Sequence, residues 1–408
     1  MNWMVGRGLL PRRSGIEWGT RCALALLASM LGYQTVTHGI ALAVQRTDAV
    51  QAYRLAPSDS QIAAALAASI FTTDQSPRAQ PHITDLARQA LRGDPTAEQA
   101  AATLGLQEQL RGHSVMARRW FGYAQMLSRR DLQVQLWAIE DAIGRGDIPA
   151  ALHQYDTALR TSNAASELLF PVLGGAIAEP DVRRGLVSTL VKKPSWATSF
   201  IEYAANAGVD PKAVATLFVD LRRAGVAVSG EATRAVITRL VQAGSPMLAW
   251  RYYATVRASV DRYRSRDPSF TAQLDVPTPF DWVVANEPGL SASIEAGHRG
   301  GLVNFSALSG VGGEVVRQMQ FLPPGRYRIE GHAKDTDRST RSTSYWTLNC
   351  WHGRELEQVV VPADKRFAGF FTVPVDCPLQ MLTLVARASD AITGVSGQID
   401  RVQLAPAP

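Results

Sequence analysis

The sequence offers few residues whose types and spacing could perform catalysis. It contains no nucleophile elbow, zinc-protease helix, phosphate-binding loop or dinucleotide-binding fingerprint. Glycoside hydrolysis would need two carboxylates facing each other across a sugar. The C-terminal third does carry glutamates, but their spacing selects no pair: Glu295, Glu314, Glu330 and Glu355. The histidines are scattered, without two at metal-ligand spacing. We therefore expect no catalytic residue, no metal and no cofactor.

Cysteine chemistry is concentrated in the same third of the chain. Cys350 and Cys377 each lie in or beside a predicted strand, with 26 residues between them (377 − 350 − 1). A disulfide closing a loop of this length would stabilise the fold by about 3–4 kcal/mol on the chain-entropy estimate. Two buried thiols are the alternative. We expect the disulfide, because the N-terminal sequence described below predicts export to an oxidising compartment.

Both cysteines belong to a region with the pattern of an all-β domain. Short alternating apolar runs are separated by Gly, Pro and Asp turns, a pattern typical of a β-sandwich or barrel. The runs are Trp282–Val284, Leu290–Glu295, Leu302–Phe305, Val315–Phe321, Gly325–His332, Ser344–Trp351, Gln358–Val361, Ala368–Val373, Gln380–Arg387 and Gly397–Leu404.

Three short motifs in this region resemble jelly-roll carbohydrate-binding modules. The segment 322–327 matches the strand entry L-x-P-G-x-Y, 371–374 matches F-x-V-P, and 399–404 matches the closing strand I-D-D-V-x-L. The resemblance implies an antiparallel sandwich over 280–408 that faces a glycan. Members of the family often bind a structural Ca²⁺ near the closing strand. Asp400 could serve as a ligand, but Arg401 replaces the second Asp, so we expect no metal.

Aromatic residues are the candidate glycan contacts that this resemblance suggests. In binding members of the family, rings on a concave face or in rim loops stack on sugar rings. The candidates here are Trp282, Tyr345, Trp346 and Trp351, and Phe370 is a further available ring. Each could instead be a core residue. Strand alternation places Trp346 and Trp351 on opposite faces unless a bulge intervenes, so at most one of these two rings belongs to the core.

The N-terminal half of the chain is organised around a repeat. Four residues in 98–127 recur 34 positions later with three types kept and an aromatic at the fourth. The first set is Gly112, Ala117, Phe121 and Ala124, and the second is Gly146, Ala151, Tyr155 and Ala158. Small residues at fixed places in a 34-residue period are typical of stacked helical hairpins. An ordinary helical bundle with a coincidental spacing is the alternative.

This repeat resembles the tetratricopeptide repeat (TPR). In that family the Gly lies in the turn between the two helices, and the small and aromatic residues pack neighbouring helices. Leu104-Gly105 fits the family's Leu-Gly pair, whereas the second copy has Ala138-Ile139, and both copies lack the closing Pro. The resemblance implies a protein-docking surface on the first helix of each hairpin. Its candidate residues are Glu108, Gln135, Trp137 and Glu140, although Trp137 could instead pack between repeats.

Composition changes give the predicted boundaries. We expect TPR-like repeats over 45–162 and a degenerate continuation over 163–263, where Gly244, Ala249 and Tyr253 repeat part of the spacing. A charged and Pro-containing linker at 264–279 precedes the sandwich. The predicted fold class is therefore multidomain α + β: an N-terminal helix, an α-solenoid and an antiparallel sandwich.

The N-terminus reads as a targeting signal. A basic region, 1–21, precedes the apolar stretch 22–44. Two interpretations remain open: a signal anchor that spans the membrane, or a signal peptide cleaved after Ala41-Leu42-Ala43. Both predict a bacterial protein whose bulk is periplasmic, and the first predicts a single pass of the inner membrane.

Charge argues against a nucleic-acid partner. The net charge of +6 is spread along the chain, without a run of five or six like charges. We expect a non-enzymatic scaffold with a protein partner on the solenoid and a polysaccharide on the sandwich, acting in assembly or export of an envelope exopolysaccharide. The alternatives are a sandwich that binds protein only, and a weak glycosidase or hydrolase accessory.

Overall fold

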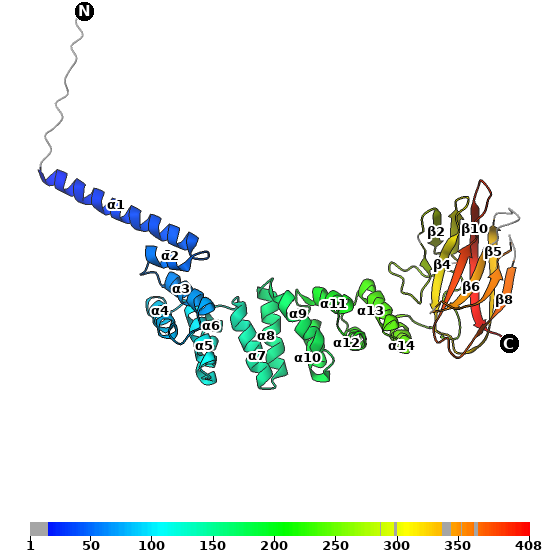
Figure 1. Cartoon of the computed structure of the whole chain (residues 1–408), viewed down its shortest axis with the longest axis horizontal. Helices are drawn as coiled ribbons and strands as arrows, with labels where there is room; N and C mark the ends of the chain where they lie inside the picture. Colours follow the sequence, from blue (N-terminus) through cyan, green and yellow to red (C-terminus); the bar gives the residue numbers. More distant parts are fainter. Residues whose placement is uncertain (1–14, 286, 298–299, 337–343, 352, 363–365) are drawn as a thin grey trace, which may run out of the picture. The chain divides into compact units, whose positions relative to one another are not determined.

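The computed structural model describes residues 15–285, 287–297, 300–336, 344–351, 353–362 and 366–408. These residues form fourteen helices and ten strands, labelled in Figure 1. The chain divides into two compact units, Met1–Asn163 and Ala164–Pro408. The described part of the first unit is helical, whereas the second begins with helices and ends in β-structure.

The N-terminal unit contains eight helices in its described residues. They are α1 Gly15–Val44, α2 Ala49–Leu55, α3 Ser60–Thr73, α4 Gln80–Gly93, α5 Glu98–Leu110, α6 Ser114–Leu127, α7 Leu132–Gly144 and α8 Ile148–Thr161. Asp side chains cap the N-termini of α2, α3, α7 and α8 by accepting bonds from backbone N–H groups. Capping therefore explains why these helices begin where they do.

The predicted membrane anchor at 22–44 is wrong. Helix α1 contains this stretch, but among the described residues no helix is both long and apolar enough to cross a membrane. Gln34 and His38 interrupt the apolar run and lower its mean hydropathy. The predicted single pass of the inner membrane is overturned by this finding. Ala41, in the predicted cleavage motif, is fully buried against Ala52 and Ile62. The basic residues Arg7, Arg12 and Arg13 lie outside the described residues.

The two hairpins α5–α6 and α7–α8 have equivalent bounds. Each helix of the second hairpin begins and ends 34 residues after its counterpart, as in 98 + 34 = 132. Gly112 and Gly146 take positive φ values of 78° and 71°. At both turns the last helical carbonyls accept paired backbone bonds, for example His113 N to Glu108 O at 2.9 Å and Gly112 N to Gln109 O at 3.0 Å.

The remaining framework residues lie in the core between helices. Each is at most 5% exposed: Ala117, Phe121, Ala124, Ala151, Tyr155 and Ala158. Phe121 packs on Gly105, where a Cβ would come within 3.0 Å of its ring. The Phe121 ring also stacks on Trp137 of the next hairpin at 4.2 Å between centroids. These small and aromatic residues therefore set the distance between neighbouring helices.

The C-terminal unit begins with six helices. They are α9 Ala165–Ala176, α10 Pro180–Val191, α11 Ala197–Asn206, α12 Pro211–Arg223, α13 Gly230–Gln242 and α14 Pro246–Val256. Arg239 of α13 donates from Nη1 to Ala204 O (3.2 Å) and Ala205 O (3.0 Å), at the end of α11. A cation at a helix C-terminus satisfies free carbonyls and complements the helix dipole.

Ten strands form an antiparallel β-sandwich after the helices. They are β1 Val283–Val284, β2 Leu290–Glu295, β3 Leu302–Ala307, β4 Gly313–Gln320, β5 Gly325–Thr336, β6 Tyr345–Cys350, β7 Glu355–Val360, β8 Arg366–Val373, β9 Gln380–Ala386 and β10 Val395–Pro406. One five-stranded sheet, which we call sheet A, has the order β1-β4-β9-β6-β7, and the other, sheet B, has the order β2-β3-β10-β5-β8.

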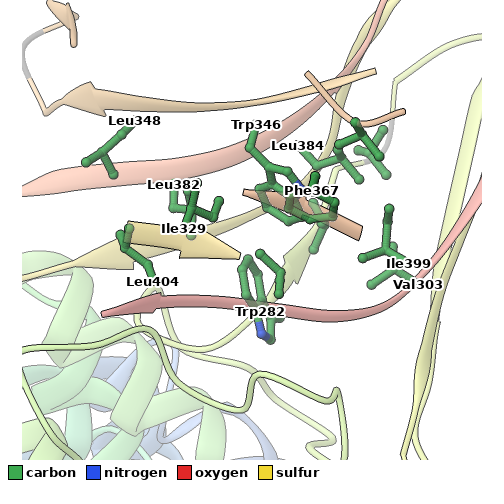
Figure 2. Close-up of a cluster of buried hydrophobic side chains, with 14 of the residues drawn as sticks. Trp282, Val303, Ile329, Trp346, Leu348, Phe367, Leu382, Leu384, Ile399 and Leu404 are labelled. Atoms are coloured by element: carbon green, nitrogen blue, oxygen red, sulfur yellow. The ribbon is translucent and has the colours of Figure 1, made fainter. Parts of the chain in front are cut away.

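Inward-facing residues of both sheets form one core (Figure 2). Sheet A contributes Trp346, Leu348, Leu382 and Leu384, and sheet B contributes Val303, Ile329, Phe367, Ile399 and Leu404. Trp282, just before β1, packs its ring 5.7 Å from that of Trp346. Burial of this apolar area is the main favourable contribution to the stability of the sandwich.

The predicted linker at 264–279 is instead part of the sandwich. Phe270 is fully buried in the sandwich core. Ser265 N donates to Leu404 O, and Leu404 N donates to Ser265 Oγ, both at 2.8 Å. Gly301 N donates to Ser269 O at 2.7 Å. A charged, Pro-containing composition suggested solvent exposure, but one buried aromatic and these backbone bonds fix the segment.

A buried carboxylate joins the last helix to this segment. Asp281 is 3% exposed, and its Oδ1 accepts from Tyr253 Oη of α14 (2.8 Å) and Arg266 Nη1 (2.6 Å). Its Oδ2 accepts from Thr278 N (2.9 Å) and Thr278 Oγ1 (2.8 Å), and lies 3.4 Å from Arg257 Nη2. Donors from the helix, the segment and the adjacent turn therefore converge on one side chain.

Gly112→Ala and Gly122→Ala are expected to change stability in opposite directions. Both sites have open space around a new Cβ. At Gly112 the positive φ makes the change cost about 1 kcal/mol, whereas inside α6 replacement of Gly122 gains up to about 1 kcal/mol of helix propensity. Thermal unfolding followed by helical circular dichroism should show a lower and a higher midpoint, respectively. A lower midpoint for both would contradict this account.

Asp281→Asn is expected to destabilise the C-terminal unit by about 3 kcal/mol, because it leaves two partly buried arginines without a countercharge. Asp261→Asn is the matched control. Its carboxylate is 45% exposed and pairs with Arg264, so its loss should cost less than about 1 kcal/mol. Urea unfolding monitored by tryptophan fluorescence measures both effects, and similar midpoints for the two variants would show that the buried carboxylate is dispensable.

Candidate functional site

Sheet B presents a polar outer face. Along β5, Tyr327, Ile329 and Ala333 point into the core, so alternation turns the intervening residues outward. Most outward side chains on this face of sheet B are charged or polar. They include Glu295, Asn304, Arg328, Glu330, His332, Lys334, Arg366, Asp400 and Arg401.

A cleft of about 1100 Å³ lies over this face. Its walls come from β5, β8 and β10, and from the turn that follows β2. The only aromatic in the described lining is Phe367, which is 4% exposed and belongs to the core. Side chains that donate and accept hydrogen bonds therefore dominate the accessible surface, and stacking platforms are not part of it.

Three carboxylates of the cleft are already engaged by neighbouring groups. His332 Nδ1 lies 3.0 Å from Asp400 Oδ1. Asn304 Nδ2 donates to Glu295 Oε1 at 2.8 Å, and Arg328 Nη2 lies 3.5 Å from Glu330 Oε2. These pairs hold the side chains in defined positions on the sheet.

The structure corrects two of the aromatic candidates. Trp346 is fully buried and Trp282 is 7% exposed, so neither ring is available to a sugar (Figure 2). Both rings face the core because they fill the space between the sheets. Tyr345 is half-buried on the outer face of sheet A, where the Arg387 guanidinium lies 4.6 Å from its ring.

Trp351 is the most exposed of the four predicted rings, at 42%. It follows β6 directly, beside the disulfide that joins Cys350 to Cys377. Arg354 donates to both carboxylate oxygens of Asp376, at 2.9 and 2.7 Å, and these bonds lower the pKa of the Asp376 carboxyl. The loop that carries Trp351 is therefore held by a covalent link and an ion pair, away from the lining of the cleft.

One exposed aromatic does lie on the outer face of sheet B. Phe370 of β8 is 40% exposed, and the Arg326 guanidinium lies 4.1 Å from its ring centroid. A smaller hollow of about 600 Å³ next to it shares Ala368 with the cleft. Phe370 is therefore an exposed ring beside the cleft, whereas Trp282 and Trp346 are buried.

The N-terminal unit has a groove of about 350 Å³ on the first helices of its hairpins. Ala68, Phe71, Ala102 and Leu106 give it an apolar floor, and its polar lining includes Thr72, Glu98, Gln99, Thr103, Arg130 and Gln133. The floor and rim residues of α5 occupy positions 99, 102, 103 and 106, which share one helical face. The groove is large enough for a side chain of a docked segment.

None of the four predicted docking residues lines this groove. Gln135 is buried, and Trp137 packs on Phe121. Glu108 accepts from Arg111 Nη1 at 3.0 Å and lies 2.8 Å from His113 Nδ1, whereas Glu140 is exposed. The i, i+3, i+4, i+7 spacing of the α5 residues was the sequence signal that could have identified the groove.

The charged face of sheet B was also absent from the predicted site residues. Its sequence signal is the charged or His side chain at every second position of β5: Arg326, Arg328, Glu330, His332 and Lys334. Alternation alone places these side chains on one face. Arg366 and Arg401 could not be added from the sequence, because they join the face only through strand pairing.

No family model matches this chain, and no curated protein matches its sequence. Similar solved structures include the enzymatically active domain of tailspike protein 4 of bacteriophage CBA120, at 12% identity and a TM-score of 0.25, covering 36% of this chain and only 21% of that one. Another is TmCBM61 in complex with beta-1,4-galactotriose (16% identity, TM-score 0.24, 37% of this chain and 99% of that one). A third is the CBM22-1 xylan-binding domain of Paenibacillus barcinonensis Xyn10C (12%, 0.25, 37% and 99%). These scores are too low to identify this chain with any of them.

Asp400→Asn and Arg366→Gln should each change the free energy of unfolding by less than about 1 kcal/mol. Asp400 and His332 are 36% and 39% exposed, Arg366 is exposed, and exposed charge pairs contribute little to stability. Chemical unfolding of the full chain measures this. A loss of several kcal/mol would show that these residues support the fold, and would disqualify them as probes of binding.

Proposed function

We propose that this protein is a non-enzymatic adaptor in which the sandwich binds a polysaccharide and the helical region docks a protein. The cleft over sheet B carries the proposal. Its size suits several sugar rings, and its lining combines carboxylate, amide, imidazole and guanidinium groups, which can bind vicinal hydroxyls. The side chains stand on strands of a rigid sandwich, so a ligand would meet them in fixed positions.

The docking role of the helical region is supported by the groove on α3 and α5. Equivalent hairpins that repeat every 34 residues, with buried small residues and glycine turns, support a TPR-like solenoid, whose first helices present such a groove. A scaffold that binds a polymer through its sandwich and a protein through its helical region would suit assembly or export of a polysaccharide. We also propose that neither end catalyses a reaction.

One observation favours a second candidate. Trp282 and Trp346 are buried, as expected if the sandwich binds protein only. In that case the exposed Phe370 and Trp351 would be contacts for a polypeptide, and the charged face would be a solvated surface.

Affinity electrophoresis of the full chain in gels containing xylan, galactan or polygalacturonate separates these candidates. We expect at least one polymer to retard the protein. The double variant Asp400→Asn/Arg366→Gln should weaken that affinity at least about tenfold, since each lost charge-assisted bond is worth about 1.5–3 kcal/mol. The absence of retardation across the polymers would favour the protein-only sandwich.

Two further variants locate the binding surface. Trp351→Ala should leave the retardation unchanged if the cleft is the site, whereas its loss would place the ligand on the disulfide loop. Arg317→Gln removes an exposed charge from sheet A and controls for nonspecific attraction to the gel. Incubation with the retarding polymer, followed by sizing of the products, tests for hydrolysis, and shorter products would contradict the non-enzymatic role.

A further inference from the structure

Three cationic or imidazole side chains form a row across sheet B. Arg401 of β10 is directly opposite His332 of β5, and His332 is directly opposite Arg366 of β8. Neighbouring strands lie about 4.8 Å apart, so each residue of the row is about this distance from the next. Lys334 follows His332 two residues later on the same face. Arg401 and Arg366 are therefore the two permanent positive charges of this row, one on each side of His332.

The carboxylates of the cleft do not neutralise this row. Asp400 is bound by His332, Glu330 lies beside Arg328, and Glu295 accepts from Asn304. Within the described residues, Arg366, Lys334 and Arg401 make no ion pair with a carboxylate at 4.0 Å or less. Arg401 donates to the neutral Gln403 Oε1 at 3.3 Å. The described lining holds four Lys or Arg side chains against three carboxylates, and Arg366, Lys334 and Arg401 are the three of these cations with no carboxylate of the described residues within 4.0 Å.

Stacking cannot replace this charge in the cleft. A neutral sugar is usually held by a ring that covers its apolar face, but the one aromatic in the described lining is the buried Phe367. Guanidinium groups instead bind carboxylates through two parallel hydrogen bonds. Charge-assisted contacts are therefore the strongest contacts that the described lining can make.

We propose that the cleft binds an acidic polysaccharide, one whose sugar rings bear carboxylates, with Arg366, Lys334 and Arg401 as its anion contacts. This inference rests on the proposed polysaccharide binding and specifies the class of polymer. Sugar carboxylates bind the row across β10, β5 and β8, and ring hydroxyls bind the engaged carboxylates nearby.

The test compares polygalacturonate with the same polymer after chemical reduction of its carboxylates, using the full chain in affinity electrophoresis. We expect strong retardation by the acidic form and at least about tenfold weaker binding of the reduced form, in which each carboxylate has become a neutral hydroxymethyl group. Arg366→Gln/Lys334→Gln should lower the affinity for the acidic form by about tenfold or more and leave binding of the reduced form unchanged. Added salt should weaken only the binding of the acidic form.

The outcomes distinguish the two proposals. Equal binding of both forms would overturn the acidic specificity and leave polysaccharide binding in place. Binding of neither form, nor of xylan or galactan, would overturn the proposed function itself. A loss of affinity in the sheet A control Arg317→Gln as large as that in the double variant would show diffuse attraction to a polyanion, and would overturn the assignment of the cleft residues.

Discussion

The buried carboxylate of Asp281 is the constraint on which the C-terminal unit depends. A charge removed from water is tolerated only when donors surround it, and here α14, the segment after it and the turn before β1 all supply donors. A shift of α14, the segment or the turn would remove a hydrogen-bond donor from the buried carboxylate. Trp250 and Tyr253 of α14 add ring contacts to Phe280, at 5.2 and 5.1 Å between centroids. Polar and aromatic contacts thus act on the same joint.

The contacts around Asp281 also help to fix the position of the charged face of sheet B. Segment 264–279 is tied to Asp281 through Arg266 and Thr278, and its first residues are hydrogen-bonded to β10 and to the turn before β3. Strand β10 carries Asp400 and Arg401. The backbone that positions the face is therefore continuous, through hydrogen bonds, with the last helix of the unit.

Local patterns in the sequence predicted most helices and strands. They could not predict which distant strands pair with each other. Alternating apolar residues identified the strands, and the spacing of Gly112 and Gly146 identified two hairpin turns. The same patterns could not say that Phe270 fills the core, because one apolar residue among Pro and charges carries no period. They could not bring Arg366 and Arg401 to either side of His332, because the register between distant strands depends on the whole sandwich. Trp282 and Trp346 were misplaced for a related reason, since exposure depends on what covers each face.

Strand β10 gives the sandwich a particular order of assembly. It pairs with β3 on one side and β5 on the other, yet it follows every other described strand in sequence. During synthesis the helical hairpins, whose contacts are mostly local, can form while the chain is still emerging. Sheet B cannot, because its middle is supplied last, and until then β3 and β5 expose unpaired edges. The interval between emergence of β5 and arrival of β10 is therefore when these two edges of sheet B are open to mispairing.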